Sequence, residues 1–290
     1  MPRCSGPSYW TTFREAGERG PGGAREAGTP MEKIPVGESR AGGYILIAFL
    51  FLLWECLARW GVVDPNFLPP PGAVARSLLG LVESGEILGC ALVTLRRVIP
   101  GCLVGASCGC LLGFLCGYSS RLRAILGPTL EWMRPMPSVA LIPVGIMILG
   151  MGDRLEVAVI GWACSWPVYI NTLAGVRSTD RMMLDTARTF GFGGSAVVFK
   201  VVVPFALPFV ATGLRVSLGI AMAVAVITEM AACGDGLGYF ILSASLSCRT
   251  PEMYAGIVAV GALGYFLNAM FLLAEGRVLA WRQGFSGDGK

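Results

Sequence analysis

Long apolar runs separated by short polar segments dominate the chain. A helix that crosses a bilayer needs about 20 mostly apolar residues, and six runs have this character. They cover approximately residues 43–63, 91–118, 130–149, 155–173, 204–231 and 253–274. The pattern therefore predicts an all-α membrane protein with six transmembrane helices.

The polar segments at both ends and after the first run predict further parts. Residues 1–42 are rich in Gly and Pro and of mixed charge, which is typical of a disordered tail, and Met31 is an alternative start. Residues 64–90 hold a proline-rich turn and then an amphipathic helix over about 73–84, which we expect to lie in the membrane interface. Residues 283–290 form a short tail.

The third apolar run differs from the others because it contains Pro135, Pro137 and Pro143. Proline lacks the backbone N–H that a helix interior requires, and its ring clashes with the preceding turn. Inside a membrane, such a break is tolerated only against protein or a water-filled cavity. We therefore expect a kinked or broken helix over about 130–149.

Residues 178–204 form a polar segment between two apolar runs, and we call this segment the ledge. Good N-cap residues precede a helix expected over 181–190, and Gly191 can end it because it tolerates positive φ. Ser195 can cap a second short helix, and Pro204 begins the next span. The segment thus predicts a bent amphipathic element at a membrane surface.

The helix of the ledge has two distinct faces. Arg181, Asp185 and Arg188 share one face with alternating charge. The other face carries apolar side chains, namely Met183, Ala187 and Phe190. A loop that merely joins two spans is the alternative, but it would not need this placement of Gly and Pro.

The composition agrees with a membrane protein and excludes several functions. The chain has 290 residues, of which 54% are hydrophobic and 14% charged, whereas soluble domains carry about 25% charged residues. A net charge of +4 is too small to indicate nucleic-acid binding. The chain has no histidine, which excludes histidine acid–base catalysis and histidine metal ligands.

The ten cysteines do not form a disulfide or metal pattern, because no CxxC pair occurs. Several of them lie in one apolar run and act as small hydrophobic residues: Cys102, Cys108, Cys110 and Cys116. Cys233 and Cys248 could pair if both face the exterior. The sequence leaves that pairing open.

The positions of Lys and Arg indicate the orientation in the membrane. If the amino terminus is cytoplasmic, the inner segments after the first tail carry ten basic residues and the outer segments five. With six spans, both termini and the ledge then lie in the cytoplasm. We therefore expect a multi-pass protein of the bacterial inner membrane with the ledge on the side that holds ATP.

Charged residues within the apolar runs are costly, so each indicates a function or a buried ion pair. Arg215 and Glu229 lie in the fifth run, and Arg97 lies at the outer end of the second. We expect Arg97 and Arg215 to line or gate a path through the membrane, with Glu229 holding one of them in an ion pair. The alternative is a purely structural salt bridge between helices.

The ledge resembles a motif of importer permeases of the ABC class, which reads E-A-A, three residues, G, nine residues, I-x-L-P. Here the E-A-A positions are Asp185, Thr186 and Ala187, the glycine is Gly191, and VVVP at 201–204 stands for I-x-L-P. The spacing matches without a gap. In that family the segment is the coupling helix region, which docks into an ATPase subunit. The resemblance implies an ATPase-coupling role for these residues: Arg181, Asp185, Ala187, Arg188, Gly191 and Pro204.

Further stretches resemble the permeases of the nitrate, sulfonate, taurine and bicarbonate branch over about residues 68–281. They include LPPPG at 68–72, RPMP at 134–137, ALIP at 140–143, NTLAG at 171–175, TGLR at 212–215 and GLGY at 236–239. The resemblance implies the type I ABC importer permease fold, with residues 91–282 as its transmembrane domain. It also implies a homodimer, two ATPase subunits that bind ATP and Mg, and a periplasmic or lipid-anchored binding protein.

The same resemblance implies a small anion as cargo, with a sulfonate or taurine favoured over nitrate or bicarbonate and an aromatic or pyrimidine-like compound left open. A P-loop would read GxxxxGK[ST], but the only Gly-Lys pair is Gly289 and Lys290. We therefore expect no enzyme activity and no cofactor in this chain.

Two other functional classes are the alternatives to a transport subunit. An ion-coupled secondary carrier acting without an ATPase subunit would need broken helices in two related halves, and only the third run is clearly interrupted. A membrane-embedded enzyme would lack histidine and have few intramembrane carboxylates.

Overall fold

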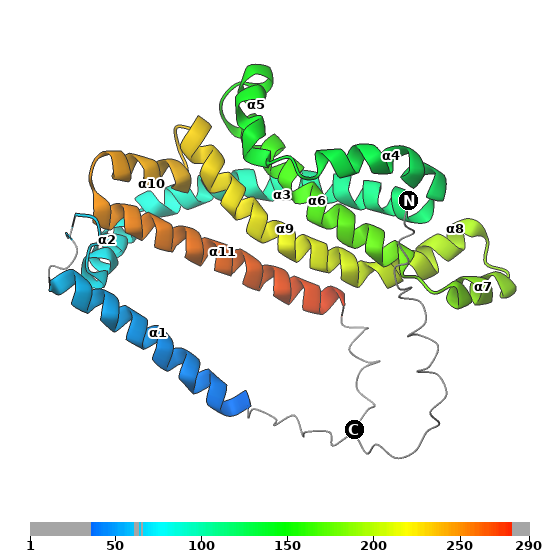
Figure 1. Cartoon of the computed structure of the whole chain (residues 1–290), viewed down its shortest axis with the longest axis horizontal. Coiled ribbons are helices and arrows are strands. Elements are labelled where there is room, and N and C mark those ends of the chain that lie inside the picture. The colour runs from blue at the N-terminus through cyan, green and yellow to red at the C-terminus, as the bar shows by residue number, and fades with distance from the viewer. Residues whose placement is uncertain (1–35, 61–63, 65, 280–290) are drawn as a thin grey trace, which may run out of the picture. The chain divides into compact units, whose positions relative to one another are not determined.

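The computed structural model describes residues 36–60, 64 and 66–279, and all regular structure in them is helical (Figure 1). The predicted all-α fold is therefore confirmed. The predictions for residues 1–35 and 283–290 lie outside the described residues.

The first helix, α1 (Val36–Arg59), contains the first membrane span, at Gly42–Arg59. The helix begins at Val36, so the expectation of disorder up to residue 42 is wrong for residues 36–42. The described helix ends at Arg59, before the expected end at 63, and residues 61–63 are outside the described part. Glu55 and Arg59 form the i, i+4 ion pair that their spacing allows, at 2.6 Å.

The next helix, α2 (Pro71–Glu83), covers the amphipathic helix expected over 73–84. Pro71 occupies its first position, where the missing N–H costs nothing. Val74 and Leu81 are buried in a cluster with Leu237 of α10 (Leu237–Leu246) and with α11 (Thr250–Val278). The apolar face of α2 therefore packs on the helices at the end of the chain.

The most extensive helix pair is α3 (Glu86–Tyr118) with α6 (Asp153–Arg177). Glycines recur every fourth residue along the face of α3 that meets α6: Gly101, Gly105, Gly109, Gly113 and Gly117. A Cβ added at Gly109 would lie 2.5 Å from the carbonyl oxygen of Ser165. The two backbones can approach this closely only because these side chains are absent. The helix begins at Glu86 and not at the expected 91, because Ile87 and Leu88 continue its apolar stretch towards the amino terminus.

The third span is broken, as the prolines predict. α4 (Ser120–Met133) and the helical segment Ser138–Leu149, which ends in α5 (Ile142–Leu149), meet at an angle of 86°. Pro135 and Pro137 lie in the break. The pair begins at Ser120, ten residues before the expected start.

The ledge contains α7 (Arg181–Thr189) and the short α8 (Gly194–Val197). α8 continues through a π-helical turn (Val198–Val202) into α9 (Val203–Ala232), which begins beside Pro204. Gly191 has a φ of +79°, as its proposed role requires. The expectation that Ser195 caps the second helix is wrong, because Gly193 precedes α8 in an extended conformation and Ser195 lies inside it.

Within the described residues, five helices are long and apolar enough to span a membrane, or six if the bent pair counts as one span. This agrees with the six predicted spans. The largest buried cluster joins α3, α5, α6 and α9. These helices therefore form the core that positions the residues discussed below.

Candidate functional site

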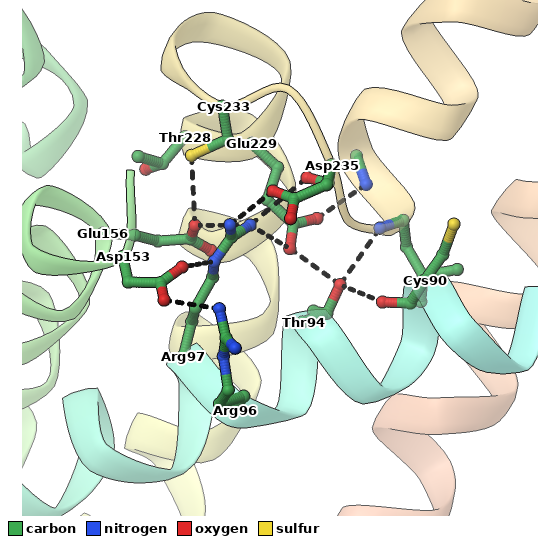
Figure 2. A network of polar contacts seen from close by, with 12 residues as sticks. Cys90, Thr94, Arg96, Arg97, Asp153, Glu156, Thr228, Glu229, Cys233 and Asp235 are labelled. Carbon is green, nitrogen blue, oxygen red and sulfur yellow. Dashed lines mark hydrogen bonds and ion pairs between the residues drawn. The ribbon is translucent and has the colours of Figure 1, made fainter. Parts of the chain in front are cut away.

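Arg97 of α3 is 2% exposed and lies at the centre of a network of four carboxylates (Figure 2). Its Nε donates to Asp153 Oδ1 at 2.6 Å, and its Nη2 donates to Asp235 Oδ1 at 2.5 Å. Its Nη1 lies 3.3 Å from Glu156 Oε2 and 3.5 Å from Glu229 Oε1. We call these five residues the Arg97 cluster.

The Arg97 cluster joins three helices and one turn. Asp153 and Glu156 lie in the first turn of α6, three residues apart and thus on one face. A helix N-terminus also favours negative charge. Glu229 lies near the end of α9, and Asp235 lies in the turn between α9 and α10. A single guanidinium therefore holds α3, α6 and α9 together.

Glu229 has further donors that fold the α9–α10 turn over it. Its Oε1 accepts from the Thr94 hydroxyl at 2.7 Å, and its Oε2 accepts from the Gly238 N–H at 2.7 Å. The Thr94 oxygen in turn accepts from the Leu237 N–H at 3.0 Å. Gly236 has a φ of +99°, and a Cβ there would lie 2.8 Å from Glu229 Oε2. Glycine is therefore needed for the turn to close.

The charges of the Arg97 cluster are unevenly exposed. The side chains of Glu156 and Glu229 are fully buried, whereas those of Asp153 and Asp235 are about half exposed. Arg96 donates to the other oxygen of Asp153 at 2.5 Å. Since a buried charge is tolerated only when it is paired, the two buried glutamates depend on their neighbours.

Of the two buried glutamates, Glu156 has fewer hydrogen-bond partners than Glu229. Its Oε1 has no hydrogen-bond partner among the described residues, and its Oε2 accepts from the Cys233 thiol at 3.3 Å. Burial, and next the Glu156 carboxylate, raises the pKa of the Cys233 thiol to about 12. The thiol therefore remains protonated and acts as a donor. Cys233 and Cys248 are both free thiols, so they are not paired.

Arg215 is not part of the Arg97 cluster. It lies on α9, fourteen residues or about 21 Å along the helix from Glu229, and it donates to Glu275 of α11. Its side chain is 46% exposed. Of the three expected path residues, the structure therefore brings Arg97 and Glu229 together and keeps Arg215 apart.

The sequence pattern does not predict the other partners of Arg97, namely Asp153, Glu156 and Asp235. Asp153 lies between the third and fourth apolar runs, and Asp235 lies 138 positions from Arg97 along the chain. Asp153 and Glu156 did carry a signal, because two acids three residues apart begin an apolar run. No local pattern connects them to α3.

In the ledge, the side chain of Asp180 caps α7 by accepting from the Met182 N–H at 2.9 Å. On the charged face, Arg188 lies 3.3 Å from Asp185, and both side chains are exposed. Arg181 is exposed at the first position of the helix.

The apolar side chains of the ledge are divided between the interior and the surface. Leu184 packs against Val176 and Val202, and Ala187 is buried. Of the apolar face predicted for α7, only Ala187 is buried. Several large apolar side chains are exposed: Met182, Met183, Phe190, Phe192 and Phe199. Exposed apolar residues of this kind are typical of a surface that binds another protein.

The long apolar helices, the broken span and the polar ledge define an all-helical, multi-pass membrane protein. Residues 109–279 match the family described as the binding-protein-dependent transport system inner membrane component. This match includes the ledge and covers more than half of the chain, and the chain belongs to that family. It is a permease component of an ABC importer and a multi-pass inner-membrane protein.

Relatives named for sulfonates, taurine and nitrate lie in the expected branch. SsuC of Bacillus subtilis, a candidate aliphatic sulfonates transport permease, is 32% identical over 245 residues, which is 84% of this chain and 89% of that protein. The taurine transport system permease TauC of Escherichia coli is 29% identical over 81% of this chain and 87% of its own length. The nitrate import permease NrtB of Synechocystis is 27% identical over 82% of this chain and 89% of its own length.

A crystal structure of an amino acid ABC transporter with histidines shares the fold, with a TM-score of 0.53 and 16% sequence identity. The alignment covers 68% of this chain and 94% of the other. The likeness supports the expected type I permease fold.

Proposed function

We propose that this chain forms the translocation path of an ATP-driven importer for a small anion, with a sulfonate or taurine as the first choice and nitrate or bicarbonate next. The observation that carries the proposal is membership of the permease family together with relatives named for sulfonates, taurine and nitrate. These cargos share an oxyanion group. The working assembly would contain two copies of this chain, two ATPase subunits and a periplasmic or lipid-anchored binding protein.

In this proposal the ledge is the coupling element on the cytoplasmic side. The buried side chains of Leu184 and Ala187 hold α7 to the chain, and the exposed side chains Met182 and Phe190 are free to enter a groove of the ATPase subunit. Closure of the two ATPase subunits around ATP would draw the two ledges together. The residues assigned to coupling are Arg181, Asp185, Ala187, Arg188, Gly191 and Pro204.

In this proposal the Arg97 cluster forms the gate at the outer end of the path. Its guanidinium is surrounded by carboxylates, which supports a closed state in which the charge of Arg97 is not available to an anion. Arg215 is half exposed and has a single acidic partner, so its charge is the more accessible of the two. We assign Arg215 to the wall of the path, and Arg97 and Glu229 to its gate.

Reconstitution tests this proposal. Liposomes containing the chain, its ATPase subunits and the binding protein should accumulate radiolabelled taurine or nitrate only when ATP is present. Ligand identification on the binding protein would select the cargo. Uptake by the chain alone, without nucleotide, would instead identify an ion-coupled secondary carrier.

A further inference from the structure

A polar pocket of about 430 Å³ opens at the end of α3 opposite to the Arg97 cluster. It lies between the turn that joins α3 to α4 and the turn that joins α6 to α7. Gly117 and Ser120 line it on one side, and Thr179 and Leu184 line it on the other. Gly117 is twenty residues from Arg97, or about 30 Å along α3, so the pocket is distinct from the cluster.

Three arginines line the pocket, one from each adjoining helix. Arg123 belongs to α4, Arg177 is the last residue of α6, and Arg181 is the first residue of α7. No carboxylate is among the residues that line it. Within the described part of the chain, none of the three arginines forms an ion pair, and Arg123 has only a carbonyl contact at 3.5 Å.

The acids nearest in sequence are already engaged. The carboxylate of Asp180 caps α7, and that of Asp185 pairs with Arg188. Three like charges around one cavity repel each other, and an anion between them would relieve that repulsion. Guanidinium groups are suited to this role because they bind planar or tetrahedral oxyanions through paired N–H donors.

Thr179 provides an independent sign of a missing partner. The residue is 8% exposed, it lines the pocket, and its Oγ1 has no hydrogen-bond partner among the described residues. A buried hydroxyl without a partner is unfavourable and needs an explanation.

We propose that this pocket binds an oxyanion of the phosphate or sulfonate type. The ligand is either the phosphate of an anionic lipid headgroup or a soluble anion, and the recognition chemistry is the same for both. A bound oxyanion would tie the start of α4 to the start of α7 and so restrain the ledge. This site is separate from the translocation path of the proposed importer.

Thermal unfolding of the purified full-length chain tests the proposal in two arms. In detergent, inorganic phosphate is compared with chloride at equal ionic strength. In nanodiscs, phosphatidylcholine alone is compared with an equal mixture of phosphatidylcholine and phosphatidylglycerol. A ligand that binds only the folded state raises Tm by a few degrees. A rise with phosphate identifies a soluble anion, and a rise only with phosphatidylglycerol identifies the lipid phosphate.

The double variant Arg123→Gln, Arg177→Gln should lose that rise. The matched control is Arg121→Gln, since Arg121 is exposed on the same helix but does not line the pocket, and it should keep the rise. If the double variant does not fold, Thr179→Val keeps the shape of the side chain and should reduce the rise. An unchanged rise in either pocket variant, or no rise in both arms, overturns the proposal. Neither measurement depends on transport, so this outcome is independent of the proposed function.

Discussion

At the scale of single residues, the Arg97 cluster is sensitive because its charges depend unequally on one guanidinium. Glu229 has two other donors, Thr94 and Gly238. Glu156 has only the Cys233 thiol besides Arg97, and one of its oxygens is unpartnered among the described residues. Removing Arg97 would therefore leave Glu156, more than Glu229, as a buried charge without a partner.

Arg97→Gln should lower the free energy of unfolding by roughly 3–5 kcal/mol, because it removes one partner from buried ion pairs. Thermal unfolding in detergent measures the loss. The matched control is Arg96→Gln, since the Arg96 side chain is 65% exposed and pairs with the same Asp153. An exposed pair contributes about 0–1 kcal/mol. Equal losses in the two variants would contradict the central position of Arg97.

Arg215→Gln tests whether a cation in the wall of the path is needed. If Arg215 attracts the anion, the variant should reduce ATP-dependent uptake while the protein remains folded. Glu275→Gln removes the same ion pair but keeps the cation, so it should retain uptake. If the two variants reduce uptake equally, the pair is structural and Arg215 has no role in the path.

At the scale of helices, the glycine stripe of α3 sets how closely α3 and α6 pack. Between transmembrane helices, association depends on van der Waals packing and close backbone approach, since lipid tails provide no hydrophobic driving force. A Cβ at any glycine of this stripe would lie less than 3.0 Å from an atom of α6, either of its backbone or of a side chain close to it. Since α3 and α6 carry most of the Arg97 cluster, their spacing also positions the cluster.

Gly109→Ala should therefore destabilise the protein by roughly 1–3 kcal/mol, in the range for overpacking. The same change at an open helical position is usually stabilising, because Ala is favoured over Gly by about 1 kcal/mol. Gly89 provides this control on the same helix, since nothing lies within 4 Å of a Cβ added there. Thermal unfolding should lower the Tm of the Gly109 variant and leave the Gly89 variant unchanged or more stable.

The membrane spans were predictable because apolar length is a local property of the chain. The break in the third span was predictable too, since Pro135 and Pro137 remove helix hydrogen bonds wherever they occur. The residues at which the helices begin and end were less predictable. α3 begins at Glu86 and not at 91 because Ile87 and Leu88 continue its apolar run. At α8, Gly193 and Ser195 are both acceptable N-cap residues, and their local sequence does not distinguish between them. The Arg97 cluster could be predicted only in part, because Asp153 and Asp235 reach Arg97 through the tertiary packing of α3, α6 and α9.

At the scale of the whole molecule, one continuous helical stretch connects the two candidate sites. Gly194–Ala232 runs for 39 residues from the ledge to Glu229 in the Arg97 cluster. A rigid element that both sites contact can carry a displacement from one to the other. In the proposed importer, movement of the ledge by the ATPase subunits would thus be transmitted to the Arg97 cluster through α9.

Gly191 is the residue at which this connection can be tested. Its φ of +79° is strained for any side chain, and most of all for a β-branched one. Since nothing lies within 4 Å of an added Cβ, Gly191→Val would act through the backbone alone and shift α7 relative to α8. Basal ATP hydrolysis by the partner subunits should persist, whereas its stimulation by the loaded binding protein and uptake should be lost. The control is Gly193→Val, two residues away, where φ is −66° and an added Cβ again meets open space. Normal stimulation in the Gly191 variant, or equal loss in both, would show that the ledge does not couple through this backbone conformation.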